Sequence, residues 1–144
     1  MNKQIARNAL VVVGAWALSA TIAMLIALVL IPLNNRLTFR GDTGVVIMWV
    51  WSGLPKVVTA VGATLAVLWL IDNTKRPYAW VGALAALYLY GGLTDAVRTR
   101  GGFQSAPTVL DNVGIVINGL LPAFSCAAAA VWYRRRRPAG VTRV

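Results

Sequence analysis

The sequence predicts an all-α polytopic membrane protein, an antiparallel bundle of four transmembrane helices, and three observations support this fold class. First, 58% of the 144 residues are hydrophobic and only 12% are charged, whereas soluble domains carry about a quarter charged residues. Second, the mean hydropathy is +0.68. Third, four apolar runs are each long enough to cross about 30 Å of hydrocarbon as a helix. We therefore expect a single transmembrane domain over 1–137 and a short cytoplasmic tail over 138–144.

The first apolar run, 9–33, contains 25 residues without a charge, and a helix of that length crosses the hydrocarbon with some tilt. A secretory signal peptide is the rival interpretation, because Lys3 and Arg7 precede the run and Ala17-Leu18-Ser19 loosely resembles a cleavage site. Since the apolar stretch continues far beyond that site, we expect a membrane span.

The second run, 44–71, is interrupted at Pro55 and Lys56, and two geometries compete there. A continuous helix kinked at Pro55 places Lys56 inside the membrane, because proline removes a backbone donor and commonly bends a helix. Alternatively, a new helix begins near Ser52 and leaves 44–54 as an interfacial or re-entrant segment. We favour the continuous helix.

The third run, 78–97, follows the polar linker 72–77, which is long enough only to connect antiparallel neighbours. The second and third helices are therefore expected to form a hairpin. The fourth helix is expected over 108–133, since Thr108 and Asp111 have the spacing of a capping box, although with Asp in place of the usual Glu or Gln.

Lysine and arginine residues predict the orientation, because positively charged flanks resist translocation. With four spans, nine of these residues fall on one side of the membrane and four on the other. The nine-residue side is expected to be cytoplasmic, so we predict a multi-pass protein of the cell (inner) membrane with both termini in the cytoplasm. A basic block at the end of the fourth helix is expected to contact anionic lipid headgroups. It consists of Arg134, Arg135, Arg136 and Arg137.

Three polar residues are predicted to lie at one depth in the membrane. Measured at about 1.5 Å per residue from the cytoplasmic helix ends, Lys56, Asp95 and Asn118 lie about 24–26 Å along their helices. This level is the outer third of the bilayer, where an unpaired charge costs about 1–3 kcal/mol. We therefore expect an intramembrane Lys56–Asp95 ion pair with Asn118 nearby. The alternative is a Lys56 side chain that extends to the headgroups.

Small residues accompany these polar residues on the same helix faces. Four of them are candidates for hinges or packing contacts: Pro55, Gly91, Gly92 and Pro122. Small side chains let helices approach closely, which is the usual packing solution in lipid, so packing is the more common role of such glycines.

The composition also limits the function. With no histidine, no glutamate and one cysteine, we expect no enzyme, no metal site and no cofactor. Nucleic-acid binding is not expected despite the net charge of +10, because the basic residues flank apolar runs. Two functions remain. The first is an accessory or interaction subunit that forms a homo-oligomer or joins another membrane protein. The second is a small oligomeric channel, or an ion- or proton-coupled transporter, that uses Lys56, Asp95 and Asn118. The sequence favours the first, since four helices enclose little volume.

Overall fold

The computed structural model describes residues 3–36, 41–71, 77–101 and 108–136, and these ranges contain four helices and no strand. All four helices are long and apolar enough to cross a membrane. The predicted all-α fold is therefore confirmed, and the chain is a small polytopic membrane protein. The helices are α1 (Lys3–Arg36), α2 (Gly41–Leu70), α3 (Pro77–Gly101) and α4 (Val109–Arg136).

The helices extend beyond the apolar runs from which they were predicted. α1 begins at Lys3 and α4 ends at Arg136, because a helix satisfies its own backbone groups and does not have to end where the hydrocarbon ends. α2 is one uninterrupted helix that contains Pro55. The continuous geometry is thus correct, and the re-entrant alternative for 44–54 is wrong.

The start of α4 is held by the predicted capping box. The backbone N–H of Asp111 donates to the Thr108 hydroxyl over 3.2 Å, and the N–H of Thr108 donates to the Asp111 carboxylate over 3.0 Å. These two bonds satisfy backbone donors that the first turn of a helix leaves without partners. Asp therefore performs the capping role that Glu or Gln usually performs.

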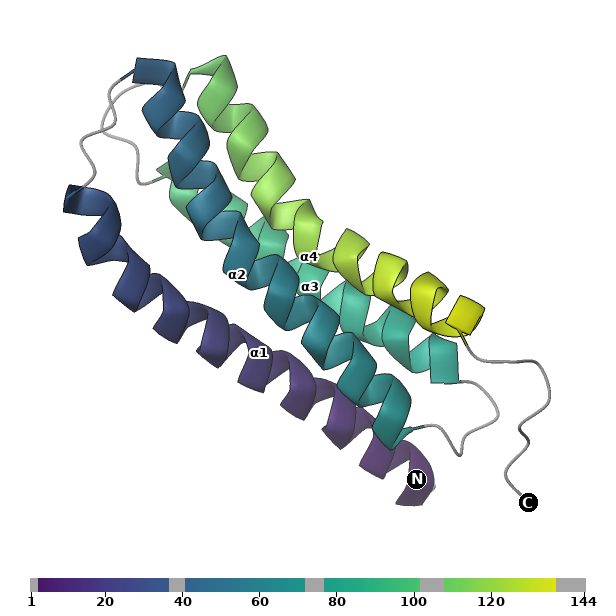
Figure 1. Cartoon of the computed structure of the whole chain (residues 1–144). Coiled ribbons are helices and arrows are strands. Elements are labelled where there is room, and N and C mark those ends of the chain that lie inside the picture. The colour runs from purple at the N-terminus through teal and green to yellow at the C-terminus, as the bar shows by residue number, and fades with distance from the viewer. Residues whose placement is uncertain (1–2, 37–40, 72–76, 102–107, 137–144) are drawn as a thin grey trace.

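The four helices form an antiparallel bundle in which α1 and α3 run in one direction and α2 and α4 run in the other (Figure 1). The start of α1 and the end of α4 lie at the same end of the bundle, which we name the basic end. α4 packs against both α2 and α3, whereas α2 and α3 share the smallest interface of the five helix pairs that touch. The expected hairpin is therefore loose, because α4 occupies the position between its two arms.

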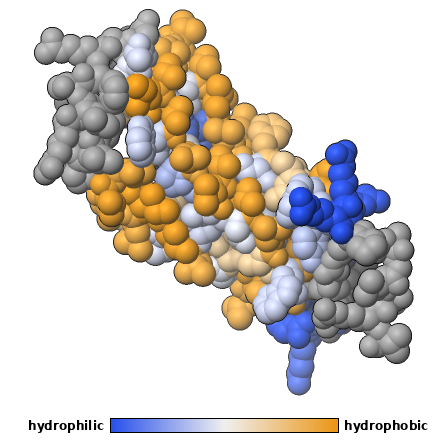
Figure 2. All heavy atoms as spheres, in the orientation of Figure 1, coloured by the Kyte–Doolittle hydropathy of each residue, from blue (hydrophilic) through white to orange (hydrophobic). Residues whose placement is uncertain are grey.

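The closely packed part of the bundle lies toward the basic end. Its largest fully buried side chains come from α2 and the residue that follows it, from α3 and from α4, and they are Thr64, Val67, Leu68, Ile71, Leu84 and Cys126. Figure 2 shows apolar residues along most of the visible face and hydrophilic residues gathered near the basic end. This distribution agrees with a bundle whose middle lies in hydrocarbon and whose end lies in water.

α3 and α4 cross where Gly92 meets Gly119. A Cβ atom added at Gly92 would lie 2.9 Å from the Gly119 Cα and closer still to its carbonyl group. Only glycine permits this approach of two backbones. In Figure 1, α4 bends near its middle, and Pro122 lies at the middle of its residue range.

Candidate functional site

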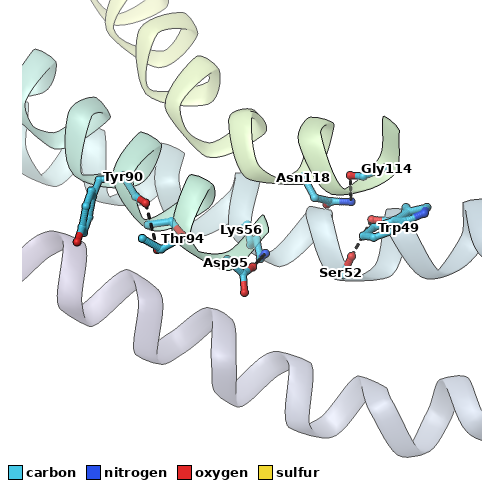
Figure 3. A network of polar contacts seen from close by, with 9 residues as sticks. Trp49, Ser52, Lys56, Tyr90, Thr94, Asp95, Gly114 and Asn118 are labelled. Atoms are coloured by element: carbon cyan, nitrogen blue, oxygen red, sulfur yellow. Dashed lines mark hydrogen bonds and ion pairs between the residues drawn. The ribbon is translucent and has the colours of Figure 1, made fainter. Parts of the chain in front are cut away.

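The structure brings Lys56 of α2 and Asp95 of α3 together as an ion pair, with the ammonium nitrogen 2.9 Å from the Asp95 Oδ2 atom. Figure 3 shows the two side chains pointing toward each other across the space between the helices. The Lys56 side chain is 34% exposed and that of Asp95 is 55% exposed. The pair therefore joins α2 and α3, whose mutual interface is small, and both side chains remain partly exposed.

Two cavities adjoin this ion pair. The larger, named the central cavity, has a volume of about 420 Å³ and is lined by all four helices. The smaller, named the outer cavity, has a volume of about 260 Å³ and is lined by α2, α3 and α4 on the side away from the basic end. The residues that line both cavities are Ser52, Lys56, Gly92, Asp95 and Asn118. The three polar residues predicted to lie at one depth thus all face the same two spaces.

The walls of the central cavity are mostly apolar. α1 contributes two large side chains, Trp16 and Met24, and three alanines, Ala20, Ala23 and Ala27. The alanines recur along one face of α1 and leave room that larger residues would fill. This space is therefore suited to an apolar group beside a charged one.

Asn118 contributes a buried amide that is only half satisfied. The residue is 5% exposed, and its Nδ2 atom donates to the Gly114 carbonyl over 3.2 Å. Its Oδ1 atom is buried and accepts no hydrogen bond within the described ranges. The Oδ1 atom packs against Gly53 of α2, where an added Cβ atom would collide with it.

Trp49 contributes the complementary group, a buried donor. Its Nε1 atom is shielded from solvent and has no hydrogen-bond partner among the described residues. Its indole ring packs against Gly114, where even a Cβ atom would collide with it. Trp49 and Asn118 both line the outer cavity, but these two polar atoms are themselves buried.

The central cavity is bounded toward the basic end by a contact between α1 and α3. The Ser19 and Tyr88 hydroxyl groups hydrogen-bond to each other, and Ser19 also donates to the Trp16 carbonyl over 2.7 Å. Beyond this contact lies the packed core around Leu84 and Cys126. The Ser19–Tyr88 contact and this core thus lie between the central cavity and the basic end.

The remaining predicted residues fall into two groups. Gly91, Gly92 and Pro122 line the central cavity, and Pro55 is buried within α2. The basic block lies at the end of α4, where the Arg136 guanidinium stacks 4.6 Å from the centre of the Trp132 ring. Arg134 to Arg136 are exposed, whereas Arg137 and the tail 138–144 lie outside the described residues.

The sequence did not predict the hydrogen bond between Ser19 and Tyr88 or the buried Nε1 atom of Trp49. Tyr88 lies two helical turns from Asp95 on α3, so the helical repeat does place the two residues on the same face. The role of Trp49 depends on its contact with Gly114 of α4, and no local pattern reports that contact.

No family model, curated protein or solved structure matches this chain. The helices define it as a small polytopic membrane protein, and its particular function has to be inferred from the ion pair and the cavities.

Proposed function

We propose that the chain is a small membrane transporter whose solute binds at the Lys56–Asp95 ion pair. The observation that supports this function best is that the two cavities adjoin at this pair. An ion pair that only joins two helices needs no space around it, and packed apolar residues are often equally good at that task. Here both side chains instead retain exposed surface.

The ion pair also has unused bonding capacity. One bond joins the Lys56 ammonium to Asp95 Oδ2, and an ammonium group has three donors while a carboxylate has two acceptor oxygens. A solute that carries a charge can therefore add to the pair or replace one member of it. Because an unpaired charge is costly at this depth, such replacement couples solute binding to a change in the helix contact.

α1 is the element best placed to move during transport. It contacts α2 and α3 but not α4 over the described residues, and the Ser19–Tyr88 hydrogen bond joins it to α3 below the central cavity. Movement of α1 away from Tyr88 would open the cavity toward the basic end. Alternating access of this kind requires one group of helices to move against another around a fixed site.

The test is flux into proteoliposomes containing the wild-type chain or the double variant Lys56→Met/Asp95→Leu. Removing both charges leaves no unpaired group, so we expect the double variant to keep its fold, measured by helicity and by elution from a sizing column. We expect it to lose solute flux. Thr94→Val is a matched control, since Thr94 is next to Asp95 but lines neither cavity, and it is expected to retain flux.

A double variant that transports at the wild-type rate contradicts the proposal and leaves the pair with a structural role. A panel of ions and small polar solutes is required, because the substrate is not specified by the ion pair alone.

A second candidate function is that of an interaction subunit, which the exposure of α1 favours. Only 11% of its most apolar window is buried inside the chain, against 39% for α2 and for α4. Such a helix is available to contact a second copy of the chain or another membrane protein. Crosslinking and size measurement in mild detergent test this function, and a protein that remains monomeric without a partner counts against it.

A further inference from the structure

The ion pair brings one charged donor and one charged acceptor to both cavities. Lys56 provides the ammonium group and Asp95 provides the carboxylate, and both side chains retain exposed surface. The cavities therefore present two opposite charges to any solute that enters them.

The two opposite charges limit the net charge of that solute. A simple anion that approaches Lys56 also meets the Asp95 carboxylate, and a simple cation that approaches Asp95 also meets the Lys56 ammonium, which lies 2.9 Å away. Like charges at such distances repel strongly where water is scarce. A molecule that carries one positive and one negative group satisfies both side chains and adds no net charge to the membrane interior.

The adjoining spaces limit the shape of the solute. The outer cavity of about 260 Å³ and the central cavity of about 420 Å³ both have mostly apolar walls, and the ion pair borders both. Asn118 and Ser52 face both spaces. A solute with a compact charged head and an apolar side chain can therefore place each part in a matching environment.

We propose that the site binds a small zwitterion with an apolar side chain, the chemistry of an aliphatic α-amino acid. The carboxylate of the zwitterion accepts hydrogen bonds from Lys56. The ammonium group donates to Asp95, and the side chain enters the central cavity. This inference rests on the site identified under the proposed function, but it concerns binding and is tested without measuring flux.

The experiment measures the thermal stability of the purified full chain in lipid nanodiscs with three probes of the same carbon skeleton. L-leucine has both charged groups, 4-methylpentanoate lacks the ammonium group, and 3-methylbutylamine lacks the carboxylate. We expect leucine to raise the unfolding temperature in a concentration-dependent manner, because a ligand that binds only the folded state stabilises it. The two analogues are expected to have no effect at equal concentration. Either analogue acting as strongly as leucine, or no effect of leucine, overturns the proposal.

The double variant Lys56→Met/Asp95→Leu tests the assignment of the head group. It removes both charges without leaving either one unpaired, so leucine is expected no longer to raise the unfolding temperature. Trp69→Phe is the control that is expected to keep the effect of leucine, because Trp69 is 73% exposed and lines neither cavity. Leucine that stabilises the double variant as much as the wild-type chain overturns the proposed contacts.

The two proposals fail separately. Leucine binding without leucine flux supports the zwitterion site and contradicts transport. Flux of another solute without leucine binding supports transport and overturns the zwitterion site.

Discussion

At the scale of single residues, the cost of placing charge in hydrocarbon determines which side chains meet. Lys56 and Asp95 lie on helices with little other mutual contact, yet their charged groups are 2.9 Å apart. Each would be costly alone at this depth, and together they remain accessible from the cavities. Near the ion pair, the backbones of α3 and α4 also pack closely against each other at Gly92.

The substitution Gly92→Ala is expected to destabilise the bundle by about 1–3 kcal/mol, which is typical of overpacking. The added Cβ would meet the backbone of Gly119, and a backbone cannot rotate away as a flexible side chain can. Thermal unfolding in detergent measures the effect. Gly82→Ala is the control, since a Cβ at Gly82 meets nothing within 4 Å. Equal unfolding temperatures for the two variants would show that the α3–α4 crossing is looser than described.

The grouping of the three polar residues could be predicted from the sequence. The rise of a helix is constant, so Lys56, Asp95 and Asn118 could be placed at one depth by counting residues. The cavities could not be predicted, because they depend on which helix faces which. The orphan state of Trp49 Nε1 likewise depends on the contact between α2 and α4.

At the scale of the helices, a predicted boundary was accurate where a local signal marked it. The reciprocal hydrogen bonds of Thr108 and Asp111 begin α4 within one residue of its predicted start. α3 was predicted to end at residue 97 but continues to Gly101, because a polar residue does not by itself end a helix. The loose contact between α2 and α3 was not foreseen, since a short linker does not prevent a later helix from packing between them.

The capping box provides a prediction for α4. Thr108→Ala removes the hydroxyl that accepts from the Asp111 N–H, and it is expected to cost about 0.5–2 kcal/mol. Thermal unfolding measures the loss, and amide hydrogen exchange is expected to accelerate in the first turn of α4. The control is Thr21→Ala, because the Thr21 hydroxyl bonds only to the Ala17 carbonyl of its own helix. Unchanged exchange in Thr108→Ala would indicate that tertiary packing alone fixes this helix start.

At the scale of the whole molecule, the packed core and the cavities occupy different halves of the bundle. The core lies toward the basic end, and the cavities lie beyond the Ser19–Tyr88 contact. The basic residues predict that this core half faces the cytoplasm. Under that orientation, the packed core belongs to the cytoplasmic half of the bundle and the Lys56–Asp95 pair belongs to the external half.

The central claim is that the Lys56–Asp95 pair borders cavities that external solutes reach. Ser52 lines both cavities, so it reports on them directly. The test is modification of Ser52→Cys by a membrane-impermeant thiol reagent added outside intact cells, in a Cys126→Ala background, because Cys126 is the natural cysteine.

We expect Ser52→Cys to be modified and Val58→Cys to be spared, since Val58 is 59% exposed but lines neither cavity and faces lipid. Leucine is expected to slow the modification of Ser52→Cys. If Ser52→Cys remains unmodified from outside, or reacts no faster than Val58→Cys, the polar site is not open to external solutes and the central claim is wrong.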